Sequence, residues 1–353
     1  MTNTIGGNGD GPYGLQEPEK IFTIRSYPFN PEVGSIGIPN YEGLKKIIPE
    51  DEMITPANCM GDESWFYHKY LPLLDYPDRY GKVKDIRDFC LKAQLVSYEQ
   101  YRALQEGFNY KMWDWYSGML VWKNQNPWTA LRGFFYDYFL DYTGGYFGYK
   151  HGATPVHIQL NLNDSVVCIV NQTATKLEKI TAVIQLFELH GKSINEQKIP
   201  VKLEANKQKL LNRIDLPKNG NEVFFLKLLL LDNDKVLDEN FYWLTNKPRS
   251  YEQLNELEKV KVQMSVYKTG ARLAGISISN PGNETALFIR LKLINNENAL
   301  VLPVFFTDNY FTLLPGESKK LELDFTNSKN VDDIDALKLA VEGWNIIPGE
   351  IAF

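Results

Sequence analysis

Hydrophobic and polar positions follow two different patterns along this chain of 353 residues. In residues 82–106, apolar side chains recur near helical spacing and neither glycine nor proline interrupts them. The pattern predicts a long helix that ends near Gly107. Shorter helices are expected over 41–47 and 128–139, and a short buried strand over 118–122, where the sequence reads GMLVW.

After His157 the pattern changes to short runs of β-forming residues, separated by Asn, Asp, Gly and Pro. Roughly seven such runs fill residues 156–250, the size of one immunoglobulin-like sandwich. A second set of runs follows from Val260 to the end of the chain. The sequence therefore predicts a first domain over 1–155 and two β-sandwiches over 156–250 and 251–353.

Aromatic residues divide the chain in the same place. Residues 1–150 hold 30 of the 46 Phe, Trp and Tyr residues. The first region is thus irregular and aromatic, whereas the remainder has the composition of ordinary β-sandwiches.

Charge and cysteine content exclude several classes of protein. A formal net charge of -6 gives no general attraction to phosphate backbones, so nucleic acid is not expected as a partner. No apolar run is long enough to span a bilayer, and the opening residues do not read as a signal peptide, so no membrane association is expected. The cysteines Cys59, Cys90 and Cys168 have no metal-site or disulfide spacing and are expected to be packed thiols.

The sequence contains no convincing motif for a cofactor, a metal or an activated nucleophile. Gly9, Gly11 and Gly14 satisfy G-x-G-x-x-G, but Pro12 interrupts the turn and no strand precedes it, which favours a surface loop. The four histidines show no paired ligand spacing, and no G-x-S-x-G elbow occurs. Neither a cofactor nor a metal is expected.

Carbohydrate chemistry fits the first region better, because apolar sugar faces stack on Trp and Tyr while amides and charges fix the hydroxyls. The stretch VWKNQNPWTALRG places Trp122 and Trp128 around Asn124 at the predicted exit of a buried strand. A tryptophan pair of this kind is also common in a hydrophobic core, and the pattern alone leaves both interpretations open.

Glu32 is the second candidate for a functional residue in the first region. Residues 27–29 are predicted to form a short strand, and Pro31 and Gly34 punctuate a turn that would present the carboxylate at its end. In barrels of parallel strands, catalytic groups lie at the carboxyl ends of the strands. Composition alone does not separate this glutamate from the other acidic residues.

Long collinear motifs reveal a family resemblance. Those that carry it include FNPEVGSIGIP (29–39), FYHKYLP (66–72), DFCLKAQLVSYEQYRAL (88–104), GMLVWKNQNPWTALRGFFYDYFLD (118–141) and FTDNYFTLLPGE (306–317). Through these, the chain resembles the C-terminal part of glycoside hydrolase family 2, in its exo-β-D-glucosaminidase and mannosylglycoprotein endo-β-mannosidase branch. The resemblance implies the end of a (β/α)8 barrel, up to about residue 155, followed by two immunoglobulin-like sandwiches.

The resemblance also assigns roles to residues. Glu32 matches the family's nucleophile at the end of the seventh barrel strand, and Trp122 matches the tryptophan at the end of the eighth. Trp128 matches a second tryptophan of the same loop. The family's reaction is retaining and needs a second carboxyl group as acid/base. The matching glutamate belongs to the fourth strand, which this chain does not contain.

The missing half of the barrel shapes the functional expectation. A (β/α)8 barrel needs about 250 residues, far more than the first region offers. We therefore expect a C-terminal portion of a retaining β-glycosidase that is inactive in isolation unless an N-terminal chain or segment completes the barrel. The alternative is a non-catalytic protein that binds glycans or acts as a scaffold.

The resemblance leaves the substrate open between β-mannosides and β-glucosaminides. The motifs at 29–35 and 121–133 favour an endo-β-mannosidase. Family members typically work in secreted, vacuolar or periplasmic compartments, and the sequence itself does not fix a location.

Overall fold

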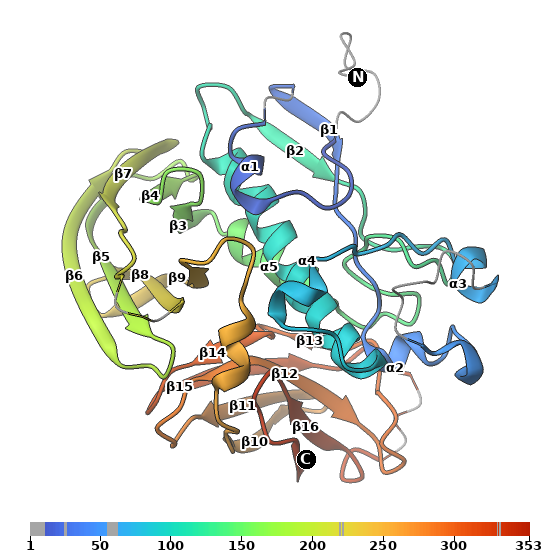
Figure 1. The fold of residues 1–353 in the computed structure, drawn as a ribbon. Coiled ribbons are helices and arrows are strands. Elements are labelled where there is room, and N and C mark those ends of the chain that lie inside the picture. Colours follow the sequence, from blue (N-terminus) through green and yellow to red (C-terminus); the bar gives the residue numbers. More distant parts are fainter. Residues whose placement is uncertain are drawn as a thin grey trace.

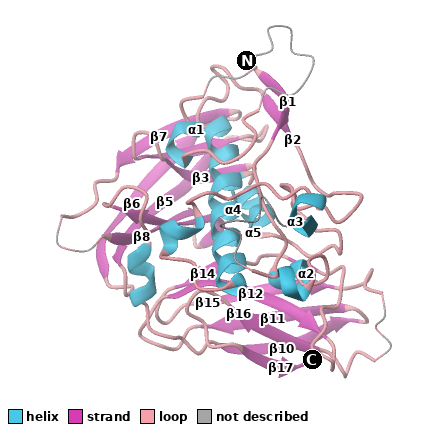
Figure 2. Cartoon of the chain, turned by 45° about the vertical axis from the view of Figure 1, so that its right-hand side comes forward, coloured by secondary structure: helices cyan, strands magenta, loops and turns pink. Residues whose placement is uncertain are grey.

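The molecule is built from an aromatic first region that packs against two β-sandwiches (Figure 1). A computed structural model describes residues 11–24, 27–54, 63–218, 220, 222–329, 331 and 333–353. The long helix α4 runs through the middle, with the first sandwich on one side and the second beneath it (Figure 2). Gly9 and Cys59 lie outside the described residues.

Helices are confined to the first region and the two connections. The α-helices are α1 (Pro18–Ile21), α2 (Tyr41–Leu44), α3 (Glu63–Tyr67), α4 (Ile86–Asn109) and α5 (Gly144–Gly152), and short 3-10 helices are η1 (Glu50–Glu52), η3 (Pro77–Tyr80) and η4 (Glu252–Glu256). No helix of the described ranges is both long and apolar enough to cross a membrane.

Helix α4 confirms the predicted long helix and owes its start to a side-chain cap. Asp85 accepts hydrogen bonds from the backbone N–H groups of Arg87 and Asp88, both at 2.9 Å. From Phe89 onward almost every side chain is buried, and even Lys92 is fully buried, with its ammonium donating to the carbonyl of Gly81 at 2.7 Å. The helix is therefore surrounded by protein rather than lying on a surface.

Helix α5 was not expected, because its sequence GGYFGYKHG is rich in glycine, which disfavours helices. The glycines let its backbone touch α4. A Cβ atom on Gly148 would lie 2.2 Å from the carbonyl oxygen of Tyr98, and one on Gly144 would lie 2.4 Å from that of Gln94. Close helix packing thus outweighs the weak helix propensity.

The helix predicted over 128–139 is wrong, since this stretch forms turns and isolated bridges. Side chains satisfy the backbone locally in place of helical hydrogen bonds. The amide of Asn126 donates to the carbonyls of Ala130 and Arg132, and the carboxylate of Asp137 accepts from the N–H groups of Phe139 and Asp141.

Two strands of the first region, β1 (Phe29–Val33) and β2 (Gly118–Val121), pair in parallel. Their inner face packs on a cluster that contains Val33 and residues of α4. Gly11 donates to the carbonyl of Glu32, and Gly34 donates to that of Pro12, so residues 11–12 lie along the other edge of β1. This is the barrel remnant that the sequence predicts, with β1 flanked on both edges.

The first sandwich consists of two antiparallel sheets with the strand orders β3-β4-β7 and β6-β5-β8-β9. Its strands are β3 (Val156–Asn161), β4 (Val166–Asn171), β5 (Leu177–Glu188), β6 (Ser193–Leu203), β7 (Lys207–Arg213), β8 (Val223–Asp232) and β9 (Lys235–Thr245). Alternating apolar residues of both sheets, such as Ile158, Ile184 and Leu228, form the core between them.

The second sandwich has the strand orders β10-β11-β15-β13 and β14-β12-β16-β17. Its strands are β10 (Gln263–Gly270), β11 (Leu273–Ser279), β12 (Ala286–Ile294), β13 (Phe305–Phe306), β14 (Phe311–Leu313), β15 (Ser318–Asp324), β16 (Lys338–Glu342) and β17 (Gly349–Ala352). The fold class is thus a partial barrel followed by two immunoglobulin-like sandwiches. The domain boundaries near residues 155 and 250 stay predictions.

All three parts meet in one hydrophobic core. Tyr98 of α4 contacts Trp243 of β9 and Phe288 of β12, with 5.7 Å between ring centroids in each case. Trp243 and Phe288 also contact each other edge to face. The helix α4 is therefore packed simultaneously on both sandwiches.

Candidate functional site

The carboxyl ends of β1 and β2 form the candidate site. The backbone N–H of Trp122, directly after β2, donates to the carbonyl of Val33 at 2.8 Å, which extends the pairing past the strand. The peptide bond between Trp122 and Lys123 is cis. The last residues of both strands and the loops that follow them are thereby held side by side.

A register shift between the two strands sets the direction of Glu32. Asn30 pairs with Met119 and Val33 pairs with Val121, so three steps along β1 match two along β2. Side chains alternate along a strand, and Val33 is fully buried on the inner face. Glu32, its neighbour, is half-buried, and from this alternation we infer that it faces the outer side. Bulges commonly re-aim a side chain in this way next to active sites.

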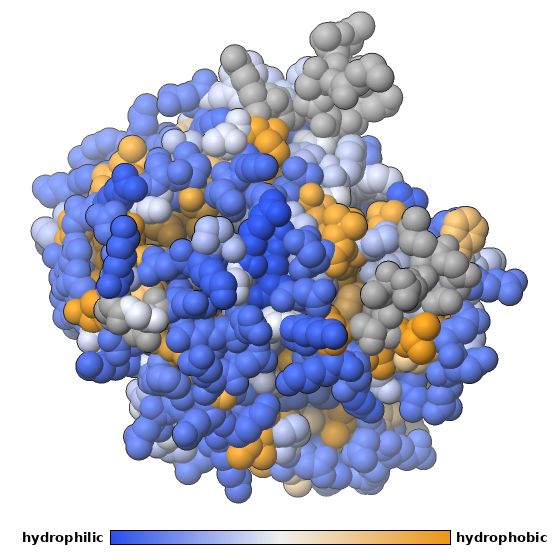
Figure 3. All heavy atoms as spheres, in the orientation of Figure 1, coloured by the Kyte–Doolittle hydropathy of each residue, from blue (hydrophilic) through white to orange (hydrophobic). Residues whose placement is uncertain are grey.

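The outer face of the pair also carries large apolar side chains, and we call it the open face. Phe29 is 52% exposed, Leu120 56% and Trp122 45%. Met119 and Val121, which alternate with the last two, pack instead on the inner cluster. Apolar patches reach the surface at the top of the molecule, where β1 and β2 lie (Figure 3). Glu32 and Trp122 thus share one apolar face.

The strand itself differs from the expectation. A strand over 27–29 with a turn at Pro31 was predicted, whereas β1 runs from Phe29 to Val33 and contains Pro31 and Glu32. Proline has no backbone N–H to donate. It is tolerated here because the register shift leaves residue 31 without a pairing partner in β2. Glu32 is therefore the next-to-last residue of the strand and does not lie in the turn.

The carboxylate of Glu32 has no polar partner in the part of the chain that the structure describes. Its backbone N–H donates to the side chain of Asn30 at 3.1 Å, and its carbonyl accepts from Gly11. No described residue forms a hydrogen bond or ion pair with its side-chain oxygens. A half-buried carboxylate on an apolar face is available to a ligand.

Trp122 connects the open face to a cavity of about 320 Å³. The cavity lies where the loops after β1 and β2 meet, and its lining includes Gly34, Ser35, Trp122, Lys123 and Arg132. Tyr13 stands edge-on to the Trp122 ring at 5.7 Å between centroids, and the Lys123 ammonium lies 5.2 Å from the centre of that ring.

Trp128 and Asn124 have other surroundings. Trp128 is 36% exposed and stacks on His68 at 5.9 Å, with Tyr67 edge-on at 5.8 Å. Asn124 is exposed, and its backbone carbonyl accepts from Phe135 at 3.0 Å. No ring contact joins Trp122 to Trp128 among the described residues. The structure thus forms two aromatic surfaces from the loop after β2.

Several residues of the site were not singled out from the sequence. Tyr13, Lys123 and Arg132 line the cavity, and Tyr67 and His68 form the surface around Trp128. These residues lie in or next to motifs that the sequence analysis quoted. The contact between Tyr13 and Trp122, however, joins distant segments and could not be predicted from the sequence.

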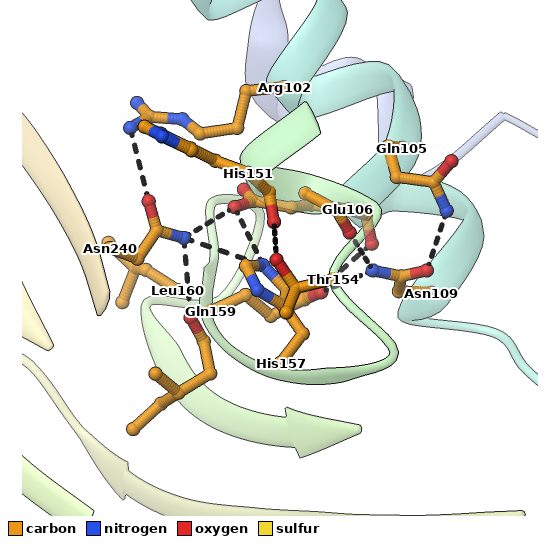
Figure 4. Close-up of polar contacts among 12 residues, drawn as sticks. Arg102, Gln105, Glu106, Asn109, His151, Thr154, His157, Gln159, Leu160 and Asn240 are labelled. Atoms are coloured by element: carbon orange, nitrogen blue, oxygen red, sulfur yellow. Dashed lines mark hydrogen bonds and ion pairs between the residues drawn. The ribbon is translucent and has the colours of Figure 1, made fainter. Parts of the chain in front are cut away.

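A second concentration of titratable groups lies in the interior, between α4 and the first sandwich (Figure 4). His157 is fully buried, and its ring nitrogens contact Asp238 at 2.8 Å and Glu106 at 3.3 Å. Burial lowers the pKa of His157, but the two carboxylates outweigh it and raise this pKa to about 9. Asn240 donates to Glu106 at 2.7 Å. All four side chains are buried, so this cluster joins α4 to the first sandwich in the interior.

The described residues contain no group of three or more His, Cys, Asp or Glu side chains arranged to hold a metal ion.

Family models match both sandwiches. The Mannosidase Ig/CBM-like domain matches residues 164–247, and the Exo-beta-D-glucosaminidase Ig-fold domain matches residues 240–346. Similar proteins extend the match to the rest of the chain. A mannosylglycoprotein endo-beta-mannosidase from Lilium longiflorum is 30% identical, over 98% of this chain and 45% of the relative. An exo-beta-D-glucosaminidase from Arthroderma benhamiae is 28% identical, over 96% of this chain and 42% of the relative.

Through these matches the chain is similar to members of glycoside hydrolase family 2. It corresponds to the C-terminal portion of these enzymes and spans less than half the length of the family 2 relatives it matches.

Solved structures agree with this fold. The crystal structure of the exo-chitosanase of Amycolatopsis orientalis superimposes with a TM-score of 0.82 at 22% identity, over 97% of this chain and 45% of that one. A beta-D-mannosidase from Dictyoglomus thermophilum gives a TM-score of 0.74 at 18% identity, over 94% and 39% of the two chains. The barrel remnant and both sandwiches therefore have the same fold as the matching parts of these two structures.

Proposed function

We propose that this chain is the nucleophile-bearing portion of a retaining β-glycosidase that hydrolyses β-mannosidic or β-glucosaminidic bonds of glycans. One observation carries the proposal: Glu32 and Trp122 lie on one face, at the carboxyl ends of two paired parallel strands. In barrels, this is where catalytic groups sit.

The proposed reaction is a double displacement. The Glu32 carboxylate attacks the anomeric carbon, and the bond from that carbon to the leaving oxygen breaks while an acid elsewhere in the site protonates this oxygen. Water then cleaves the glycosyl ester and returns Glu32 as a carboxylate. The absence of any ion pair to Glu32 from the described residues leaves the carboxylate free for attack.

Trp122 supports the same proposal. Its ring is 45% exposed, and sugar rings present apolar C–H faces that pack on indole. The ring is fixed from one side by Tyr13, which stands edge-on to it.

The acid/base carboxyl group must come from other residues. In retaining enzymes the two carboxyl groups are about 5 Å apart. The other large side chains of the open face, Phe29 and Leu120, are apolar. We therefore propose that a further barrel segment supplies the acid, and that the 353-residue chain alone does not turn over substrate.

The test uses this chain together with the polypeptide that completes the barrel, assayed on nitrophenyl β-mannoside and β-glucosaminide. Glu32→Gln should reduce kcat by at least about 10²-fold, the scale for loss of a catalytic side chain. Glu50→Gln, at an exposed position in η1, is the matched control and should retain activity. Near-native turnover by the Glu32→Gln variant would remove the assignment.

Covalent trapping tests the nucleophile independently of the acid. A 2-deoxy-2-fluoro-β-mannosyl fluoride carries a leaving group that needs little protonation, so a glycosyl ester should accumulate on the peptide that contains Glu32. Mass spectrometry of the digested protein identifies the labelled residue. A label on any other carboxylate contradicts the proposed role of Glu32.

A second candidate function is glycan binding without hydrolysis. The observation that favours it is the pair of exposed aromatic surfaces, one with Tyr13 and Trp122 and one with Tyr67 and Trp128. Binding of a mannose-rich oligosaccharide by the completed protein without turnover, and its loss in Trp122→Ala, would support this function over the first.

A further inference from the structure

The cavity beside Trp122 contains two basic side chains. Lys123 and Arg132 both line it, together with the aromatic side chains of Tyr13 and Trp122. Neither cation forms an ion pair or hydrogen bond with any described residue through its charged group. Among the residues that the structure describes, no aspartate or glutamate lines this cavity.

Two other basic groups that line cavities of this molecule do have counter-charges. Arg79 forms a two-point ion pair with Glu17, and Arg290 contacts three carboxylates from the first region and the second sandwich. In those places the fold itself supplies the anion. In the cavity beside Trp122, no described residue does.

The electrostatics of Lys123 show the same imbalance. Burial lowers the pKa of its ammonium, and the positive charge of Arg132 lowers this pKa further. The two like charges therefore disfavour each other, and an anion placed between them would relieve the repulsion of both.

The shape of the cavity indicates what carries the anion. Its volume of about 320 Å³ lies at the small end of the range for ligand sites, and one wall is the ring of Trp122. An indole wall next to two cations suits a ligand with an apolar ring face and an anionic substituent at its edge.

We propose that this cavity binds a sugar unit that carries a negative charge, either the carboxylate of a uronic acid or a phosphate ester. The sugar ring lies along Trp122, and its anionic group lies between Lys123 and Arg132. An amine-bearing sugar is disfavoured at this position because its ammonium would face two cations. The inference rests on the proposed function only in placing this sugar next to the bond that Glu32 attacks.

Titration calorimetry on the 353-residue chain tests the proposal with four probes: glucuronic acid, mannose 6-phosphate, mannose and glucosamine. Two partly exposed charge pairs contribute about 0.2–1 kcal/mol each, which corresponds to roughly 2- to 30-fold in affinity. At least one anionic sugar should bind about threefold or more tightly than mannose in 20 mM salt, and the difference should shrink in 300 mM salt. The tighter of the two anionic probes identifies the anion.

The variant Lys123→Gln/Arg132→Gln should bind the anionic sugars no better than mannose, and Trp122→Ala should weaken all four probes. Lys207→Gln/Lys261→Gln removes two exposed charges elsewhere and should leave the preference intact. The proposal is overturned if glucosamine binds as tightly as glucuronic acid and mannose 6-phosphate, if none of the probes binds, or if the first double variant keeps the preference. The proposed role of Glu32 in hydrolysis is tested separately. It fails if the Glu32→Gln variant keeps its turnover, and that result does not depend on which probes bind.

Discussion

Gly34 lies directly against the backbone of Trp122. A Cβ atom at residue 34 would be only 1.9 Å from the carbonyl oxygen of Trp122, far inside contact distance, and the obstacle is backbone rather than a flexible side chain. The loop after β1 and the loop after β2 can approach only because residue 34 has no side chain.

Gly34→Ala should therefore destabilise the barrel remnant and displace Trp122. Overpacking of this kind costs about 1–3 kcal/mol, measured as a lower denaturant midpoint followed by tryptophan fluorescence. The control is Gly349→Ala in β17, where a Cβ atom would meet only Val341 at 3.8 Å. Equal stability of the two variants would mean that the two loops do not touch as described.

The buried His157 predicts a loss of stability in alkaline solution. The folded pKa of about 9 lies above the ordinary value of 6.5, so the stabilisation is complete below pH 6.5 and is lost as the pH rises through 9. By the size of the shift, the loss is about 3 kcal/mol.

The measurement is the free energy of unfolding between pH 6 and pH 10. His157→Gln should lower stability at pH 6 and reduce the slope across this window. His190→Gln is the control, because its ring is 56% exposed although it contacts Glu284. An unchanged slope in the His157 variant would contradict the assignment of the charged histidine.

Arg290 joins the first region to the second sandwich through buried ion pairs. It contacts Asp141 and Glu342 at 2.7 Å and Glu42 at 3.0 Å. Burial raises the pKa of Asp141 even with this cation beside it. Removal of the cation leaves buried carboxylates without their main partner.

Arg290→Met should consequently lower the free energy of unfolding by about 3–5 kcal/mol, the scale for a broken buried pair. Lys268→Met removes an exposed pair with Asp335 and should leave the free energy of unfolding nearly unchanged. The measurement is thermal unfolding of both variants at neutral pH. A comparable loss of stability in the two would argue against a special role for Arg290.

The thiols of Cys90 and Cys168 should not react in the native protein. Both are free and buried, burial raises the pKa of the Cys90 thiol, and it raises the pKa of Cys168 to about 12. In a Cys59→Ser background, a disulfide reagent at pH 8 should label neither until denaturant is added. Rapid labelling of either thiol would show that its surroundings open readily.

The pattern of apolar and polar residues correctly predicted the elements that are determined by their local sequence. The spacing of apolar residues predicted α4, and short alternating runs predicted both sandwiches, because in these places the local pattern and the burial in the fold agree. The parallel strands of the barrel remnant were predicted less well. The strand expected over 27–29 shares only Phe29 with β1, and β2, expected to be buried, is partly exposed.

The failures share a physical cause, which is contact between distant segments. Helix α5 forms because Gly148 lets it pack on Tyr98, and no local rule contains that contact. The turns at 128–139 depend on side-chain hydrogen bonds such as those of Asn126 and Asp137. Both segments were judged by propensity alone, which tertiary contacts overrode.

The candidate site was only partly visible for the same reason. A sequence motif pointed to Glu32 and Trp122, but the direction of Glu32 depends on a register shift, and a shift of this kind is a property of two paired strands. The positive charge of the cavity depends on Lys123 and Arg132 having no acidic side chain nearby among the described residues. That information exists only once the chain is folded.

The contacts of Tyr98 with Trp243 and Phe288 also govern the order in which the chain can mature on the ribosome. The face of α4 that carries Tyr98 is not fully covered until β12 has been made, about 190 residues later, which takes roughly 10–40 s at ordinary rates of synthesis. Through that interval the nascent helix exposes aromatic surface. Newly made chains of this protein are therefore expected to depend on chaperones until their last sandwich emerges.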